Sequence, residues 1–147
     1  MVNSVYLLHK GSFTNKRLNF QNNVVESNAV YADLNMLKTV LRNLLSNAIK
    51  YTPEGGTISV ATVEMNGNTH IVVTDTGVGI QVEDLPKIFD EKQHISTYGT
   101  NKESGSGLGL ILCQSFVNSN NGRLMVRSEQ GKGSSFIIEL PSVNFQG

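Results

Sequence analysis

The stretch LRNLLSNAIKYTPEGG, residues 41–56, combines the core-facing side of a helix with an unusual polar stripe. It lies in a longer segment, 34–51, in which apolar pairs recur about every four residues, as on one face of a helix. Asparagine is a mediocre helix former because its amide competes for backbone hydrogen bonds. Asn43, Asn47 and Lys50 nevertheless share a stripe about 60 degrees wide, turned away from the leucines. The stretch therefore predicts an amphipathic helix whose polar side does more than keep the protein in solution.

The rest of the chain alternates between strand and helix patterns. Asp33 is a suitable N-cap for the central helix. Period-two alternation predicts strands at 17–25, 57–65, 69–77, 123–129 and 134–140, and further helices are expected at 3–17, 82–89 and 107–120. The segment 90–105 has many turn formers and predicts a long loop. We therefore expect an α/β (α+β) two-layer sandwich, in which about three helices cover one face of a mixed, partly antiparallel sheet of about five strands.

Length, charge and cysteine content restrict the classes of protein that fit. The 147 residues suit a single domain, 1–147, with a possible N-terminal helix at 1–16. Twelve basic and twelve acidic residues cancel, so no overall charge attracts nucleic acid or an anionic membrane. The single cysteine, Cys113, excludes an internal disulfide, and its apolar neighbours favour a buried structural thiol. No apolar run is long enough to cross a bilayer, so we expect a cytoplasmic domain without direct membrane contact.

A second notable segment is VVTDTGVGI, residues 72–80. Its strand pattern ends at Asp75, and Gly77 and Gly79 follow at alternate positions. Turns without side chains let the backbone approach a ligand closely. An aspartate beside an apolar pocket can accept a hydrogen bond from an exocyclic amine such as that of adenine. Alone, the motif fits equally well an ordinary strand that ends in an Asp-Thr-Gly turn.

Two more glycine-bearing motifs follow. In ESGSGLGLILC, residues 103–113, three glycines precede a predicted helix, and free N–H groups at a helix N-terminus favour an anion such as phosphate. The motif is not a dinucleotide-binding fingerprint, because no apolar strand leads into it. GKGSSF, residues 131–136, read alone, is a hairpin turn. The polar helix stripe, read alone, is a solvated helix face, although amide oxygens and a lysine are also suitable ligands for a metal–phosphate group.

Together, and in this order, the four motifs resemble a known set. NLLSNAIKYTP, DTGVGI, GSGLGL and GKGSSF are similar to the N, G1, G2 and G3 boxes of the ATP-binding catalytic domain (HATPase_c) of sensor histidine kinases, in the GHKL superfamily. IFD, residues 88–90, resembles the start of the F box. The similarity runs from about residue 17 to residue 141, and four ordered motifs are far more specific than any one of them. The resemblance implies a Bergerat-type ATP-binding fold with ATP and Mg²⁺ as cofactors.

The resemblance also implies roles for individual residues. Asn47 corresponds to the Mg²⁺ ligand, Asn43 to a second contact with metal or phosphate, and Lys50 to a phosphate contact. Asp75 corresponds to the residue that recognises the adenine amino group. The remaining implied nucleotide contacts are Tyr51, Gly77, Gly79, Ile80, Phe89, Lys102, Gly105, Gly107, Leu108, Gly109 and Ser135. Ser135 and Gly79 would act on adenine through water, Phe89 would pack against the start of an ATP lid at 90–106, and Lys92 or Lys102 would reach the γ-phosphate from that lid.

The reaction and its partners follow from the same comparison. ATP-hydrolysing members of the superfamily resemble this pattern but have glutamate where Asn43 stands, and an amide cannot take a proton from water. We therefore expect transfer of the γ-phosphoryl group to a histidine. His9, His70 and His94 lack the neighbours of a phosphoacceptor histidine, so the acceptor is expected on a dimerisation domain absent from this chain, with a response regulator downstream. The sequence leaves open whether the parent protein is anchored in a membrane.

One departure from the family pattern keeps a second class of function open. EKQ, residues 91–93, replaces the usual second phenylalanine and the arginine of the F box. A nucleotide-binding module without kinase activity, which signals by lid closure, is therefore an alternative to the kinase. A true GHKL ATPase is a third and less favoured hypothesis, because no base is found near Asn43.

Overall fold

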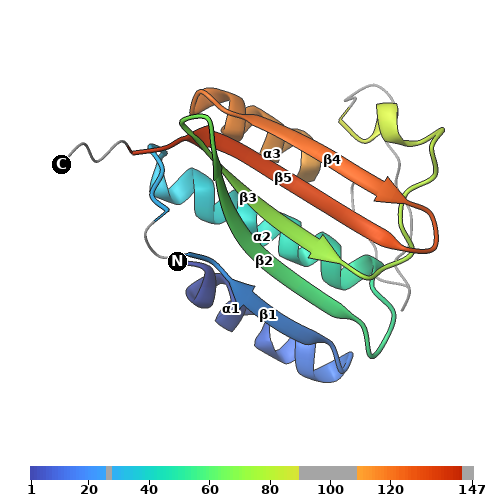
Figure 1. Cartoon of the computed structure of the whole chain (residues 1–147). Coiled ribbons are helices and arrows are strands. Elements are labelled where there is room, and N and C mark those ends of the chain that lie inside the picture. The colour runs from blue at the N-terminus through green and yellow to red at the C-terminus, as the bar shows by residue number, and fades with distance from the viewer. Residues whose placement is uncertain (26–27, 90–108, 144–147) are drawn as a thin grey trace.

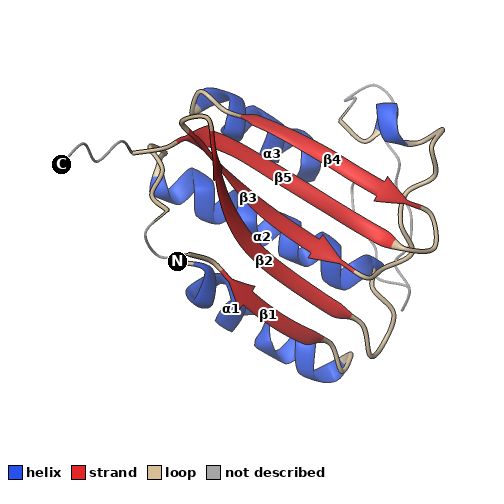
Figure 2. Cartoon of the chain, viewed as in Figure 1, coloured by secondary structure: helices blue, strands red, loops and turns tan. Residues whose placement is uncertain are grey.

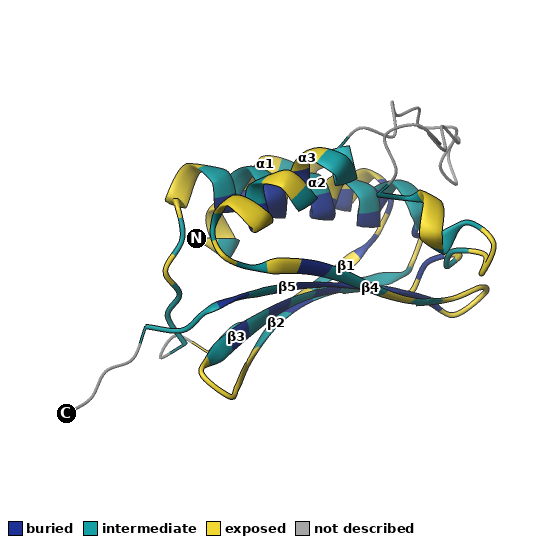
Figure 3. Cartoon of the chain, turned by 90° about the horizontal axis from the view of Figure 1, so that it is seen from above, coloured by how far each residue is buried: buried dark blue, intermediate teal, exposed yellow. Residues whose placement is uncertain are grey.

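The protein is a sheet covered on one face by helices, as Figures 1 and 2 show. The structure is a computed structural model, which describes residues 1–25, 28–89 and 109–143. Within these residues the sheet consists of β1 (Asn19–Asn23), β2 (Thr57–Met65), β3 (Asn68–Asp75), β4 (Arg123–Glu129) and β5 (Gly133–Pro141), in the order β1-β2-β3-β5-β4. The pair β1–β2 is parallel and the other pairs are antiparallel. The helices α1 (Val2–Asn15), α2 (Leu34–Tyr51) and α3 (Gly109–Ser119) lie together on one side of the sheet (Figure 3). The expected two-layer sandwich with a mixed sheet is confirmed.

The central helix begins and ends where its sequence dictates. Asp33 caps α2, because its Oδ1 accepts a hydrogen bond from the Met36 backbone N–H at 2.9 Å. The helix ends at Tyr51, since Thr52 is extended and precedes a proline. Its apolar side is buried against the sheet, where Leu44 and Leu45 are each 1% exposed. The helix predicted at 34–51 is therefore confirmed to the residue.

Strand alternation decides which side chains enter the core. Along β3 every second residue is buried, from Thr69 to Asp75, and those residues face the helices. In β5 the same row contains Ile138, and in β2 it contains Ile58; both are fully buried. None of the described helices lies over the other face of the sheet (Figure 3). Asp75 therefore stands at the end of an otherwise apolar, core-facing row.

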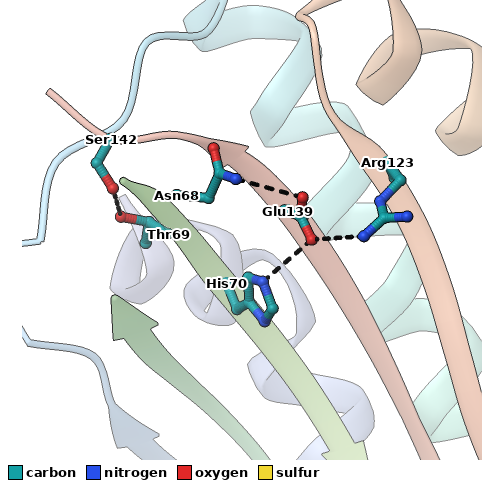
Figure 4. Close-up of polar contacts among 6 residues, drawn as sticks. All are labelled: Asn68, Thr69, His70, Arg123, Glu139 and Ser142. Atoms are coloured by element: carbon teal, nitrogen blue, oxygen red, sulfur yellow. Dashed lines mark hydrogen bonds and ion pairs between the residues drawn. The ribbon is translucent and has the colours of Figure 1, made fainter. Parts of the chain in front are cut away.

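The uncovered face of the sheet carries a polar cluster at the end farthest from Asp75. The Glu139 carboxylate on β5 accepts hydrogen bonds from Arg123 on β4 and Asn68 on β3, and its Oε2 lies 3.2 Å from Nε2 of His70 (Figure 4). These contacts join three neighbouring strands. His70 is thus part of a structural network at the opposite end of β3 from the glycine-rich turn.

Two smaller features bear on the sequence predictions. The helix expected at 82–89 is reduced to one 3-10 turn, η1 (Leu85–Lys87), because Pro86 removes a backbone donor. Cys113 is fully buried in α3, as predicted, and burial raises the pKa of its thiol to about 12, so it is inert at neutral pH. Among the helices that the structure describes, none is long and apolar enough to cross a membrane.

A buried lysine connects α1 to the end of α2. Lys16 follows α1 directly and is only 4% exposed. Its Nζ donates hydrogen bonds to the backbone carbonyls of Ile49, at 2.7 Å, and Lys50, at 3.3 Å. These carbonyls belong to the last turn of α2, which has no partners for them within the helix. The ammonium therefore satisfies the helix end and complements its dipole.

Replacing Lys16 with methionine is expected to lower the free energy of unfolding by about 1–3 kcal/mol, because one buried and one partly buried carbonyl lose a charged donor while the packing of the stem is kept. Urea denaturation of the purified chain measures the change. Lys10→Met is the matched control, since Lys10 is exposed on α1. Equal stability of the two variants would show that the buried ammonium adds nothing.

Candidate functional site

Three segments that are distant in sequence meet at one end of the sheet. They are the end of α2, the turn at 76–80 after β3, and the turn between β4 and β5. The Val78 backbone N–H donates to the Tyr51 carbonyl at 3.1 Å, and the Val78 carbonyl accepts from the Gly131 N–H at 2.8 Å. The turn after β3 is therefore fixed from both sides by backbone hydrogen bonds.

Glycines are required in this turn because the backbone segments lie so close together. A Cβ atom at Gly77 would lie 2.5 Å from the Tyr51 carbonyl oxygen. Gly79 has a φ of +74°, and a Cβ there would lie 2.2 Å from the Glu129 carbonyl oxygen. Neither contact is possible for a residue with a side chain. These glycines are therefore needed for packing of the protein on itself, and their expected close approach to a ligand stays a prediction.

Asp75 is a buried carboxylate at the end of β3, directly before this turn. It is 7% exposed, and its Oδ1 accepts a hydrogen bond from the Gly77 backbone N–H at 2.8 Å. Burial raises the pKa of Asp75 above its usual value, and the backbone N–H groups of Gly77 and Ser134 oppose that rise only in part. A carboxylate that stays buried although burial disfavours its charged form is typical of a binding site.

The polar stripe of α2 runs from this turn toward the start of α3. Asn43, Asn47, Lys50 and Tyr51 are all half-buried. Asn47 precedes Tyr51 by about one helical turn, and Asn43 precedes it by about two. A Cβ at Gly109, the first residue of α3, would lie 3.4 Å from Oδ1 of Asn43, so α3 begins beside this amide. The structure thus brings the stripe into one continuous surface with Asp75's turn at one end and the start of α3 at the other.

Two contacts within the stripe restrict its side chains. Nδ2 of Asn43 donates to the Thr39 carbonyl at 3.1 Å, which turns its Oδ1 away from its own helix backbone. The Lys50 ammonium lies 4.9 Å from the centre of the Tyr51 ring, within the range of a cation–π contact. The Asn43 side chain also hydrogen-bonds the buried Cys113 thiol, so this amide belongs both to the stripe and to the contact between α2 and α3.

The two serines of GKGSSF lie on opposite faces of the sheet. Ser135 was expected to assist Asp75, but it is paired with Thr74, and their hydroxyls are 3.0 Å apart on the uncovered face of the sheet. The residue paired with Asp75 is Ser134, which is buried on the helix-facing side. Because adjacent strand residues point to opposite faces, the register places Ser134 and not Ser135 on the same side of the sheet as Asp75, and the nucleotide role expected of Ser135 stays a prediction.

Sequence reasoning also missed Ser128 on β4. Its Oγ accepts a hydrogen bond from the Ile80 backbone N–H at 2.7 Å, donates to the Gly133 carbonyl at 3.0 Å, and lies 2.7 Å from Oγ of Ser134. The available signal was its place in the row of Leu124 and Val126, where a polar residue enters an apolar face. Ser128 thus connects the turn after β3 to the last hairpin.

The other predicted residues fall into two groups. Ile80 and Phe89 are half-buried and pack against the core, Ile80 at the end of the turn and Phe89 near α3. The expected lid at 90–106 lies outside the described residues, and so do Lys92, Lys102, Gly105, Gly107 and Leu108. In the part of the chain that the structure describes, no group of three or more His, Cys, Asp or Glu side chains is placed to hold a metal ion.

Comparisons with known proteins agree with this architecture. A family model described as histidine kinase-, DNA gyrase B-, and HSP90-like ATPase matches residues 32–144. The adaptive-response sensory kinase SasA of Synechococcus sp. (strain JA-2-3B'a(2-13)) is 40% identical over 128 residues, which cover 86% of this chain and 33% of that protein. The chain therefore spans about a third of the length of this curated relative.

Solved structures give the same assignment. The nucleotide-free catalytic domain of histidine kinase ThkA is 29% identical, with a TM-score of 0.79 over 95% of this chain and 89% of that one. Full-length ShkA in complex with AMPPNP is 25% identical, with a TM-score of 0.81 over 99% of this chain and 30% of that one. The chain belongs to the histidine kinase-, DNA gyrase B- and HSP90-like ATPase family, as the ATP-binding catalytic domain of a sensor histidine kinase.

Proposed function

We propose that this chain binds ATP with Mg²⁺ and transfers the γ-phosphoryl group to a histidine on the dimerisation domain of its parent kinase. The observation that carries the proposal is the continuous surface from the buried Asp75 to the amide stripe of α2 and on to the start of α3. Its two ends differ in chemistry, since one offers a carboxylate beside apolar side chains and the other offers amides and a helix N-terminus.

The base would occupy the end that contains Asp75. The carboxylate would accept a hydrogen bond from the adenine amino group, and the half-buried Tyr51 ring would pack beside the base. The register of β3 and β5 supports Ser134, in place of Ser135, as the serine that assists Asp75. Ile80, at the end of the turn, supplies apolar surface.

The phosphates and Mg²⁺ would lie against the stripe of α2. Amide oxygens suit Mg²⁺, which prefers oxygen ligands and usually keeps phosphate oxygens and waters in its shell. Asn47 is the proposed metal ligand, Asn43 a second contact, and Lys50 a partner for phosphate. The absence of a carboxylate cluster among the described residues fits an ion that arrives with the triphosphate. Held there by Asn47 together with the triphosphate, Mg²⁺ would supply neutralisation of phosphate charge.

The reaction would be phosphoryl transfer and not hydrolysis. The γ-phosphorus bond to the bridging oxygen breaks, a bond to the histidine nitrogen forms, and ADP leaves. An amide at position 43 cannot activate water, so positioning and charge neutralisation by the stripe would supply most of the catalysis. Lys92 or Lys102 of the proposed lid at 90–106 would add a positive charge at the γ-phosphate.

The partners follow from the kinase role. The phosphoacceptor histidine would be on the parent's dimerisation domain, and the phosphoryl group would pass on to a response regulator. ThkA supports this order, because it has been solved in complex with the response regulator protein TrrA. Residues 1–147 would form one domain of that larger protein, located in the cytoplasm.

Mixing the purified chain with the parent's phosphoacceptor domain and γ-labelled ATP tests the proposal. We expect label on the phosphoacceptor histidine, in an acid-labile linkage, only when Mg²⁺ is present. Nucleotide binding without labelled histidine would overturn the kinase role in favour of a binding module that signals by lid closure. Rapid release of labelled phosphate by the isolated chain would favour an ATPase instead.

A further inference from the structure

The hydroxyl of Ser128 has a fixed set of partners. It has one proton to donate and two lone pairs that accept. Gly133 offers a carbonyl oxygen at 3.0 Å, which can only accept, so the Ser128 proton is directed to it. Ile80 offers a backbone N–H at 2.7 Å, which can only donate, and this N–H takes one of the two lone pairs.

The third partner must then be the donor. Oγ of Ser134 lies 2.7 Å from Oγ of Ser128. Because the Ser128 proton is already directed to Gly133, all three contacts are hydrogen bonds only if Ser134 donates its proton to Ser128. In the sheet β5 lies between β4 and β3, so the Ser134 proton is directed toward β4 and away from Asp75 on β3. The Ser134 oxygen consequently has only lone pairs left for anything bound beside Asp75.

We propose that Ser128 is a positioning residue that sets the base specificity of the site by holding the Ser134 hydroxyl as an acceptor. The inference rests on the proposed function, in which a purine binds beside Asp75. Asp75 and Ser134 would then both accept hydrogen bonds from the base. A purine with an amino group at C6 satisfies them, while a purine with a keto group at C6 places its oxygen against lone pairs.

Contacts within the fold keep the Ser134 hydroxyl in this acceptor state. Ser128 is held at the same time by the turn after β3 and by the last hairpin. The Ser134 hydroxyl is itself buried, so water competes little for its proton. Without the Ser128 hydroxyl, the Ser134 proton is free to rotate and to donate to a keto oxygen.

Calorimetry with ADP and with IDP, which differ in the group at C6 and in the hydrogen that IDP carries on N1, measures this preference as a ratio of dissociation constants. The matched variants are Ser128→Thr, which keeps the hydroxyl, and Ser128→Val, which has nearly the same shape without it and also suits a strand. We expect the native chain and Ser128→Thr to prefer ADP. In Ser128→Val the preference should fall about tenfold. The freed Ser134 proton weakens one hydrogen bond to the base of ADP and allows one to the keto oxygen of IDP.

The ratio separates positioning from a merely structural role. If Ser128→Val weakens ADP and IDP equally, so that the ratio is unchanged, the inference is overturned. Should Ser128→Val fail to fold by circular dichroism, Ser134→Ala gives the answer, because it removes the acceptor and must also reduce the preference; an unchanged ratio there overturns the inference as well. A native chain that binds neither nucleotide would overturn the proposed function itself, whereas a chain that binds both without preference would overturn only this inference.

Discussion

Replacing Asp75 with asparagine is expected to weaken ADP binding by at least about a hundredfold, as measured by calorimetry of the purified chain. The carboxylate is 7% exposed, so its hydrogen bond to a base amino group would form away from water, where charged hydrogen bonds are strongest. Asparagine has the same shape but places an N–H donor where the base also donates. The variant loses both the acceptor and its charge. In addition, the buried N–H donor of asparagine is left without a partner.

Glu83→Gln is the matched control for that variant. Glu83 is exposed and close in sequence to the turn, so its change removes one negative charge without touching Asp75. We expect its ADP affinity to stay within about twofold of the native chain, since surface charges are screened. Comparable affinity of Asp75→Asn and Glu83→Gln for ADP would mean that the base does not bind at Asp75.

Replacing Asn47 with alanine is expected to remove most of the gain in nucleotide affinity that Mg²⁺ provides. Removal of a metal ligand typically leaves the base contacts intact, so affinity without metal should be nearly unchanged. In the transfer assay, the rate should fall by about a hundredfold or more, because the triphosphate loses its alignment. Titrations of ATP with and without Mg²⁺ separate the two contributions.

Asn35→Ala is the control on the same helix. Asn35 is exposed in the first turn of α2, about three turns from Asn47. Its loss should leave both titrations as they are in the native chain. The role of Asn47 as metal ligand is wrong if Asn47→Ala loses equal affinity in the presence and absence of Mg²⁺.

Most of the fold could be predicted from local sequence patterns. The α2 helix was predicted to the residue because its cap, its apolar period and the following proline all agree. The strands β2 and β4 also match their predicted spans, since each has clear alternation between turn residues. The segment around η1 was predicted less well, because its apolar residues resemble a helix while Pro86 prevents one.

The site was harder to predict because its contacts are set by pairing. Asp75 and the stripe of α2 were identified from their own segments, but the partner of Asp75 depends on the register between β3 and β5. A one-residue difference separates Ser135, on the uncovered face, from Ser134, on the same side of the sheet as Asp75. Ser128 and Lys16 have partners far along the chain, which no local pattern reveals.

The end of the site beside Asp75 needs two segments that leave the ribosome at different times. Gly133 lies so near Asp75 that a Cβ there would be 2.1 Å from the Asp75 carbonyl oxygen, and the two residues are far apart in sequence. A ribosome-bound chain that already contains the whole of α2 still lacks this half of the pocket. Nucleotide capture by nascent chains of increasing length should therefore begin only after the last hairpin has left the exit tunnel, which makes the ligand a reporter of completed folding.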